Sequence, residues 1–318
     1  MSAAPSESSA VPGGAGAWHA VREQYKLYRE FAKSGVVALV LISVLGGYLA
    51  GHPLEKTFEW SHFLWTLIGI FSLASGSSAL NQLQEVAHDA QMPRTQSRPL
   101  PTGRISRRHA VAFCFVTLAT GFLILGWLDS QVMWLGAVTV FFYNFLYTLW
   151  WKKHWAFAAI PGAIPGALPI LMGYAAASGE VFTRGGLYLF FILFFWQMPH
   201  FWALALRYQK DYALGGFPTL PVVLGAEKTV AQITMWSLAY VALAMIAPYF
   251  LMVGEIYMLA AIGVSAKILW ELRRYAKAPE GKNWLRFFLW INFSLIILIA
   301  AAVIDLWWIY LAAPLIIG

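Results

Sequence analysis

The sequence is poor in charged residues and almost free of cysteine. Asp, Glu, Lys and Arg make up 12% of the 318 residues, whereas a soluble domain carries roughly 25%. This deficit excludes an ordinary soluble globular protein. The single cysteine, Cys114, excludes an intrachain disulfide, a thiolate zinc site and an iron–sulfur cluster. The alternating polarity of a membrane β-barrel is absent as well.

Long apolar runs dominate what is present. Hydrophobic residues make up 60% of the chain, and runs of roughly 20 residues, each able to cross about 30 Å of hydrocarbon, recur from Ser34 onward. A backbone in lipid must satisfy its own hydrogen bonds, so each run is predicted to be an α-helix. We therefore predict an all-α polytopic membrane protein. The nine predicted transmembrane helices lie near residues 34–52, 62–90, 108–127, 131–151, 156–177, 186–208, 229–251, 254–272 and 287–310.

The basic residues are distributed unequally between the two sides of this bundle. Of the 22 Lys and Arg residues, only Lys56 and Arg184 fall on one side, and all others fall on the opposite side. Because basic loops stay in the cytoplasm, the N-terminus is predicted to be cytoplasmic and the C-terminus external, in a plasma (inner) membrane. The net charge of +7 is explained by this topology and requires no nucleic-acid partner.

The chain divides into three parts. Residues 1–17 are rich in Ser, Ala, Pro and Gly and predict a disordered tail. Residues 18–33 place aromatic and apolar side chains on one helical face and Lys and Arg on another. They predict an amphipathic helix at the membrane interface, with a simple cytoplasmic lead-in as the alternative. Residues 34–318 are the predicted transmembrane domain.

A polar stripe ends the second predicted helix. Asn81, Glu85 and Asp89 are spaced i, i+4 and i+8, so they share one helical face. Ionised carboxylates at the end of a membrane helix are costly and usually functional. Two carboxylates on one stripe repel each other, and a divalent cation relieves that repulsion. Oxygen ligands beside a phosphate favour Mg²⁺.

Arginines follow this stripe in a loop rich in proline. Arg94 and Arg98 lie five and nine residues after Asp89, and guanidinium groups fit phosphate oxygens. Proline and glycine end the helix and are predicted to fold the loop back over it. Together with the acids, these arginines predict a diphosphate site. An ion-paired helix end with arginines that only set the topology is the alternative.

Two further cytoplasmic segments carry candidate residues. Asp211 is the one acid in a basic stretch, and it is either a metal ligand opposite Asp89 or a solvated loop residue. Lys152 and Lys153 end the fourth predicted helix, where either could reach a diphosphate or simply anchor the helix at the membrane surface. The residue types favour phosphate binding without deciding between these alternatives.

His200 lies in an aromatic run with Trp196, Phe201 and Trp202. A lone histidine in a membrane helix is more often a packed, hydrogen-bonded side chain than a ligand. The aromatic setting nevertheless suits a flat aromatic substrate, and a haem iron accepts an imidazole. Packing and haem binding therefore both stay open for His200.

The segment Asn81–Ser106 resembles the first motif of the UbiA-type intramembrane prenyltransferases, an acid-rich helix end followed by Arg-Thr and Arg-Pro-Leu. Gln82 stands where that superfamily has its first acid, Glu85 replaces the second, and Asp89 keeps the third. These departures and the run Trp196–Trp202 are similar to the haem-prenylating branch of the superfamily. In the second motif, many members have an acid where this chain has a lysine beside its aspartate.

The resemblance implies a UbiA-like helical bundle whose central cavity opens to the cytoplasmic side. It implies transfer of farnesyl from farnesyl diphosphate to a vinyl group of haem B, giving haem O, with Mg²⁺ as cofactor. Terminal oxidases would receive the product, with haem A synthase or oxidase assembly proteins as partners. The implied site residues are Asn81, Glu85, Asp89 and Asp211 for catalysis, Glu85, Asp89 and Asp211 for the metal, Arg94, Arg98, Lys152 and Lys153 for diphosphate, and Trp196, His200 and Trp202 for haem.

Two alternative functions remain at this stage. One is prenylation of another aromatic acceptor, such as a quinone or chlorophyll precursor. The other is transport of an anionic lipid or metabolite, since broken helices and basic residues also occur in transporters. A transporter is expected to hold its charges near the bilayer midplane, whereas the charges of this chain cluster at one helix end.

Overall fold

The computed structural model describes residues 14–317, and within this range the chain is helical with no strand. The all-α prediction is therefore confirmed for the described part of the chain. Its elements are α1 (Gly14–Phe31), α2 (Ser34–Gly51), α3 (Trp60–Gln84), α4 (Val86–Asp89), α5 (Arg107–Leu128), α6 (Ser130–Val140), η1 (Phe141–Trp151), α7 (Lys152–His154), α8 (Ala159–Ser178), α9 (Arg184–Arg207), α10 (Gln209–Leu214), α11 (Leu220–Met245), η2 (Ala247–Tyr249), α12 (Glu255–Lys277) and α13 (Gly281–Ile317).

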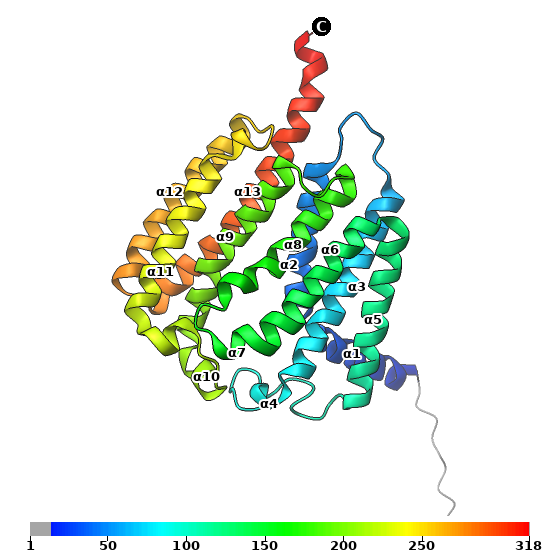
Figure 1. Ribbon diagram of the computed structural model, residues 1–318, viewed down its shortest axis with the longest axis vertical. Helices are drawn as coiled ribbons and strands as arrows, with labels where there is room; N and C mark the ends of the chain where they lie inside the picture. The colour runs from blue at the N-terminus through cyan, green and yellow to red at the C-terminus, as the bar shows by residue number, and fades with distance from the viewer. Residues whose placement is uncertain (1–13, 318) are drawn as a thin grey trace, which may run out of the picture.

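The long helices form one bundle around α8 (Figure 1). Helix α8 packs against α2 on one side, against α9 on another, and against α6 and η1. The short elements α4, α7 and α10 gather at one end of the bundle together with α1, while α13 ends at the other (Figure 1). The described chain thus starts and finishes at opposite ends, which agrees with an odd number of crossings.

Seven helical segments are long and apolar enough to cross a membrane. Helices α11 and α12, which the sequence also predicts as crossings, run beside them in Figure 1 but are not among these seven. The seven are Ser34–Gly51, Trp60–Gln84, Arg107–Leu128, Ser130–His154, Ala159–Ser178, Arg184–Arg207 and Gly281–Trp308.

The N-terminal parts of the chain follow the predicted division only partly. The predicted tail, 1–17, lies outside the described residues, except that 14–17 begin α1. The helix expected over 18–33 is α1, which ends at Phe31 and lies across the end of the bundle (Figure 1). Lys33 then adopts a left-handed conformation, with φ 52° and ψ 50°, and α2 begins at the next residue. Such a conformation is uncommon for a residue with a side chain and marks a sharp turn here.

The second predicted helix is interrupted close to its end. Instead of one helix over 62–90, α3 stops at Gln84, Glu85 has φ −106° and ψ 10°, and α4 forms one further turn. The Glu85 N–H still bonds to the Asn81 carbonyl, and the Asp89 N–H bonds to the Glu85 carbonyl. The helical path therefore nearly continues, and the predicted polar stripe stays on one side.

The fourth predicted helix contains a long π-helical segment. Residues 131–151 were expected to be an α-helix, but Phe141–Trp151 form the π-helix η1. The wider turn of a π-helix changes which side chains share a face. The Thr148 hydroxyl donates to the Tyr143 carbonyl, five residues earlier, at 2.8 Å. As a result Tyr143 and Tyr147 face the interior of the bundle while Asn144 contacts α3.

The small residues of α8 allow its neighbours to approach closely. A side chain at Gly173 would collide with the carbonyl of Val44 on α2, and one at Gly166 would collide with the amide of Gln197 on α9. Pro165 and Pro169 lie inside α8 without ending it. Helix α8 is therefore unbroken and closely packed against both neighbours.

Candidate functional site

A cavity of about 520 Å³ lies inside the bundle. Its walls come from α2, α3, α6, η1, α8, α9 and α13, and the loop after α4 lines the end where the short helices gather. Charged side chains line that end, whereas aromatic and aliphatic side chains line the rest. The cavity therefore joins a region suited to an anion with a region suited to an apolar or aromatic molecule.

The predicted polar stripe forms part of the charged wall. Asn81, Glu85 and Asp89 all line the cavity, and each side chain is almost fully buried, with 2%, 2% and 1% of its surface exposed. Buried carboxylates need compensating charge or hydrogen bonds. The surroundings of these two acids therefore decide what the site can do.

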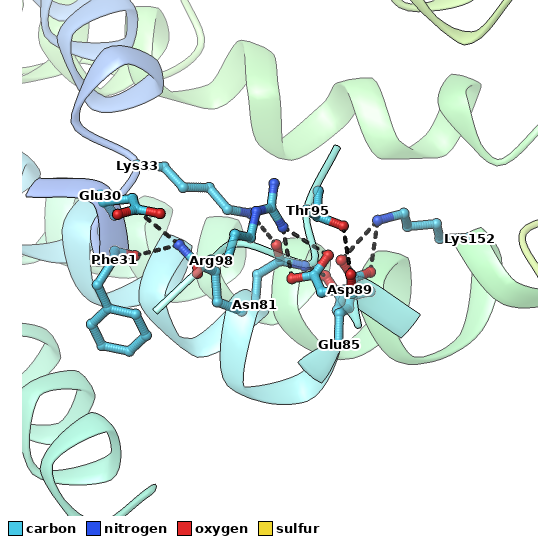
Figure 2. Close-up of polar contacts among 11 residues, drawn as sticks. Glu30, Phe31, Lys33, Asn81, Glu85, Asp89, Thr95, Arg98 and Lys152 are labelled. Atoms are coloured by element: carbon cyan, nitrogen blue, oxygen red, sulfur yellow. Dashed lines mark hydrogen bonds and ion pairs between the residues drawn. The ribbon is translucent and has the colours of Figure 1, made fainter. Parts of the chain in front are cut away.

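Each acid is paired with one base (Figure 2). The Lys152 ammonium donates to both oxygens of Glu85, at 2.7 and 2.8 Å. The Arg98 guanidinium donates to both oxygens of Asp89, at 2.8 and 2.7 Å. The Thr95 hydroxyl donates to the Asp89 carbonyl at 2.9 Å, which holds the loop over the helix end. The loop thus folds back as its prolines predict.

Lys33 also belongs to this charged end, although the residue pattern did not indicate it. Its ammonium donates to the side-chain oxygen of Asn81 (Figure 2). The Asn81 amide in turn donates to the Thr148 hydroxyl at 3.1 Å. The amide of Asn81 is thereby fixed with its oxygen toward Lys33. In a regular helix Lys33 would belong to the basic face of the interfacial helix, and only its left-handed turn sends the side chain into the cavity.

The charges at this end shift the pKa of two groups. Burial, reinforced by the nearby Arg98 cation, lowers the pKa of Lys33 to about 7. Burial by itself would raise the pKa of Glu85, but the Lys152 and Lys33 cations outweigh it and hold the pKa of Glu85 below its ordinary value. The site therefore combines a carboxylate that stays ionised with a lysine that changes charge near neutral pH.

Cations outnumber acids on the cavity wall. Four basic residues line it, Lys33, Arg94, Arg98 and Lys152, against the two acids. Arg94 is held by aromatic faces, with its guanidinium carbon 5.1 Å from the ring centre of Tyr208. The excess of positive charge suits a multiply charged anion such as a diphosphate.

Two predicted residues of the charged site lie elsewhere. Asp211, on α10, is not part of the cavity wall and accepts a hydrogen bond from the Arg94 backbone N–H at 3.3 Å. Within residues 14–317, no three His, Cys, Asp or Glu residues come close enough to hold a metal ion. The predicted set of three acids is therefore not assembled. Lys153 is likewise absent from the wall, because consecutive helical residues point in different directions and Lys152 takes the inward one.

The remaining oxygen donors still fit Mg²⁺. This ion is commonly bound by one or two carboxylates together with waters and substrate phosphate oxygens. Glu85 and Asp89 offer two carboxylates on one wall, each paired with a base that is itself a phosphate-binding group. Exchange of each base from carboxylate to phosphate would leave the carboxylates for the metal.

Gln82 explains a departure from the superfamily pattern. It is buried but does not line the cavity, and its amide donates to the backbone carbonyls of Glu30 and Phe31, at 3.0 and 2.8 Å. An amide at this position fastens α3 to the end of α1. An acid could not make these bonds while ionised, because it has no proton to donate.

The aromatic region contains His200 in a stack of rings. The imidazole lies between Trp196 and Phe288, with ring centres 4.7 and 5.0 Å away. Its Nδ1 atom is buried and has no hydrogen-bond partner among residues 14–317. Trp196 and His200 both line the cavity.

Trp202 does not share this wall. It is fully buried in the core, where it packs edge-on against Phe157 and Trp236. Two residues after His200 on the same helix, its side chain points to a different face, so the aromatic run does not act as one surface. The structure thus separates a wall residue, Trp196, from a core residue, Trp202.

Comparison with known proteins agrees with this architecture. The UbiA prenyltransferase family matches residues 40–296. The chain is 46% identical over 282 residues to the protoheme IX farnesyltransferase of Bdellovibrio bacteriovorus, covering 89% of this chain and 97% of that one. It is 39% identical over 240 residues to the protoheme IX farnesyltransferase of Roseiflexus castenholzii, covering 74% of this chain and 44% of that one.

Solved structures share the fold at low identity. A digeranylgeranylglyceryl phosphate synthase superposes with a TM-score of 0.73 at 17% identity, covering 89% of this chain and 99% of that one. A UbiA homolog from Archaeoglobus fulgidus bound to GPP and Mg²⁺ superposes with a TM-score of 0.64 at 17% identity, covering 86% and 99%. The resemblance inferred from the motifs is confirmed, and the chain belongs to the UbiA prenyltransferase family.

Proposed function

We propose that this protein transfers the farnesyl group of farnesyl diphosphate to a vinyl group of protohaem IX, making haem O for terminal oxidases. The observation that carries the proposal is one continuous cavity with a cation-rich end and an aromatic wall that contains His200. The relatives named protoheme IX farnesyltransferase, one of them 46% identical over nearly its whole length, support haem as the acceptor. Haem A synthase and oxidase assembly proteins are the partners that this function implies.

We further propose nine crossings, with the charged end of the cavity in the cytoplasm. Helices α11 and α12 join the seven apolar segments as crossings, since they lie alongside them (Figure 1). Apart from Lys267, which lies within α12, all Lys and Arg residues except Lys56 and Arg184 then fall on the side of α1 and α4. The positive-inside rule makes this side cytoplasmic and the C-terminal end external. Helix α1 rests at the cytoplasmic interface.

The diphosphate binds at the charged end by taking over cations that now hold the acids. Lys152 and Arg98 turn from Glu85 and Asp89 to the phosphate oxygens, and Lys33 and Arg94 add charge from the side of α1 and the loop. Magnesium, when bound by the two released carboxylates, neutralises part of the charge that grows on the leaving diphosphate. Asp211 as a third ligand stays a prediction that requires α10 to move toward Asp89.

The chain's role in the chemistry is to hold charge and to keep water from the farnesyl cation until the haem vinyl group reacts with it. The allylic C–O bond breaks with its electron pair leaving on the diphosphate, which Arg98 and Lys152 stabilise. The aromatic rings of Tyr143 and Tyr147 line the adjoining wall and stabilise the farnesyl cation. The haem vinyl group attacks this cation, water adds to the resulting haem-side cation, and a proton is released. The product carries a hydroxyethylfarnesyl group.

The acceptor lies against the stacked wall. Trp196 offers a flat apolar surface, and His200 offers an imidazole that can face a haem. Trp202 packs in the core and does not contact haem. Prenylation of another aromatic ring would use the same charged end and would differ only at this wall.

Extraction of haems from membranes tests the function. The chain is expressed in a bacterial host that lacks its own haem O production, and the extracted haems are separated by mass. Haem O is expected in this host and is absent with an empty vector. Abundant protein with only haem B, or with a prenylated quinone precursor, would contradict the proposal.

A further inference from the structure

A second, shallower groove opens outside the cavity, where α1 meets α2. It has a volume of about 410 Å³, and its wall comes from the last turns of α1, the turn at Lys33 and the first residues of α2. Lys26, Arg29 and Lys33 supply three basic side chains to this wall. The groove thus places basic side chains at the edge of the bundle, beside the start of a membrane-crossing helix.

The one acid on the groove wall is neutralised from outside. Glu30 accepts two hydrogen bonds from Arg104, at 2.9 Å each. Arg29 stays close to the groove because its Nε atom contacts the Ser34 hydroxyl at 3.4 Å. Lys26 forms an exposed pair with Glu23 at 2.6 Å, which is weak in water. The groove therefore carries a net positive charge suited to phosphate.

The groove adjoins the cavity. Lys33 and Val36 line both of them. Because the Lys33 ammonium bonds to Asn81 inside the cavity, its side chain forms the partition between the outer groove and the inner site. The Lys33 side chain thus lies between an anion in the groove and the acids and bases of the inner site.

An apolar strip runs from the same place along α2. Val36, Leu39 and Ile42 line the cavity, and 53%, 50% and 41% of their surfaces are exposed. In a membrane-crossing helix this surface meets lipid. An isoprenoid chain lying in the bilayer can follow this strip while its charged end stays at the interface.

We propose that the outer groove is a loading site, which captures the diphosphate headgroup of a membrane-borne isoprenoid diphosphate before it passes Lys33 into the cavity. Arg29 is the principal contact, and Lys26 assists it. This inference rests on the proposed function, which names the isoprenoid diphosphate as substrate. Phosphate is the chemistry recognised, and a phospholipid headgroup shares it, so the test separates the two sources.

Binding kinetics of an unreactive analogue test the loading role. Farnesyl thiolodiphosphate is mixed with the full chain in nanodiscs of zwitterionic lipid, and association and dissociation are followed without haem. Arg29→Gln is expected to slow both rates by roughly fivefold, the effect of one exposed charged contact. The dissociation constant is expected to stay within about twofold, since a loading contact changes the path and not the final complex. Arg29→Lys is expected to restore the rates.

Arg108→Gln is the matched control, since Arg108 is exposed at the same end of the bundle and lines neither the groove nor the cavity. Equal association rates for the Arg29→Gln and Arg108→Gln proteins would overturn the loading role. So would a weaker dissociation constant from faster release alone, which would make Arg29 a contact of the final complex.

A lipid arm distinguishes the two phosphate sources. If Arg29→Gln differs from the wild type only in nanodiscs that contain phosphatidylglycerol, the groove holds a phospholipid headgroup and the loading role is wrong. Failure of the loading role can also be distinguished from failure of the proposed function. Analogue binding with the expected rates, but no haem O from haem B and farnesyl diphosphate, would overturn the proposed function alone.

Discussion

The Lys152 ammonium contacts both carboxylate oxygens of Glu85, at 2.7 and 2.8 Å, and so joins the end of η1 to the end of α3. Arg98 binds Asp89 in the same way from the following loop. Both buried acids are thus compensated before any anion arrives. A diphosphate that binds Lys152 and Arg98 takes these bases away from the two acids. The acids then need another cation, so substrate binding is linked to metal binding.

Glu85 and Lys152 are expected to be coupled in stability. Glu85 is 2% exposed and Lys152 is 16% exposed, so removal of either charge leaves the other buried without its partner. Glu85→Gln and Lys152→Met should each lower the free energy of unfolding by about 3 kcal/mol. The double variant should lose clearly less than the sum. Thermal unfolding of the purified proteins measures this, and simple additivity would show that the pair is not a structural unit.

Asp89→Asn is expected to abolish haem O formation while preserving the shape of the side chain. The neutral amide cannot hold a divalent cation as a carboxylate does, and it weakens the contact that fixes Arg98. We expect a loss of roughly a hundredfold or more, typical of removing a metal ligand or its partner. Haem O in membranes is measured against protein abundance. Normal product at normal abundance would exclude a metal–diphosphate role for Asp89.

Binding of farnesyl diphosphate is expected to weaken as the pH rises through about 7. Lys33 has a pKa lowered to about 7 by burial, so it is charged below this pH and neutral above it. Only the charged form attracts a diphosphate. The wild-type KM for farnesyl diphosphate should therefore rise between pH 6 and 8, through this group.

Two variants isolate Lys33 from titration of the substrate itself. Lys33→Arg keeps its charge throughout this range and should remove the part of the pH dependence that belongs to the lysine. Lys33→Met should raise the KM at pH 6 and have a smaller effect at pH 8. Identical pH profiles for the wild type and Lys33→Arg would show that Lys33 does not bind the diphosphate as a cation.

The wall and core tryptophans are expected to respond differently to substitution. Trp196 lines the cavity, and Trp196→Phe reduces its ring surface and removes the hydrogen bond from its indole to the Ile291 carbonyl at 2.7 Å. It should raise the KM for haem. Trp202→Phe should lower the free energy of unfolding by about 1–3 kcal/mol through poorer packing and leave the KM for haem unchanged. A haem KM that changes equally in both would contradict the placement of Trp202 away from the substrate.

Much of the charged site could be predicted from local sequence. The spacing of Asn81, Glu85 and Asp89 survives the break at Glu85 because the backbone hydrogen bonds on either side of it persist. Proline in the loop brings Arg98 back to Asp89. These relationships depend on helical periodicity and short-range turns, which residue types largely determine.

Other parts depend on tertiary structure and could not be predicted. Nothing in the residue pattern distinguishes the π-helix η1 from an α-helix, although it selects the tyrosines of the wall. Lys33 enters the cavity only through an unusual backbone turn. Asp211 follows α10 away from the acids, because the path of a loop is set by what it packs against rather than by its composition.

The most direct measurement is a reaction of the purified protein with haem B and farnesyl diphosphate, in which haem O and released diphosphate are counted together. We expect one diphosphate for each haem O, with both products lost when magnesium is removed by a chelator and regained when it is restored. Diphosphate released without haem O, or haem O formed at the full rate in the chelator, would contradict a metal-dependent farnesyl transfer to haem in this cavity.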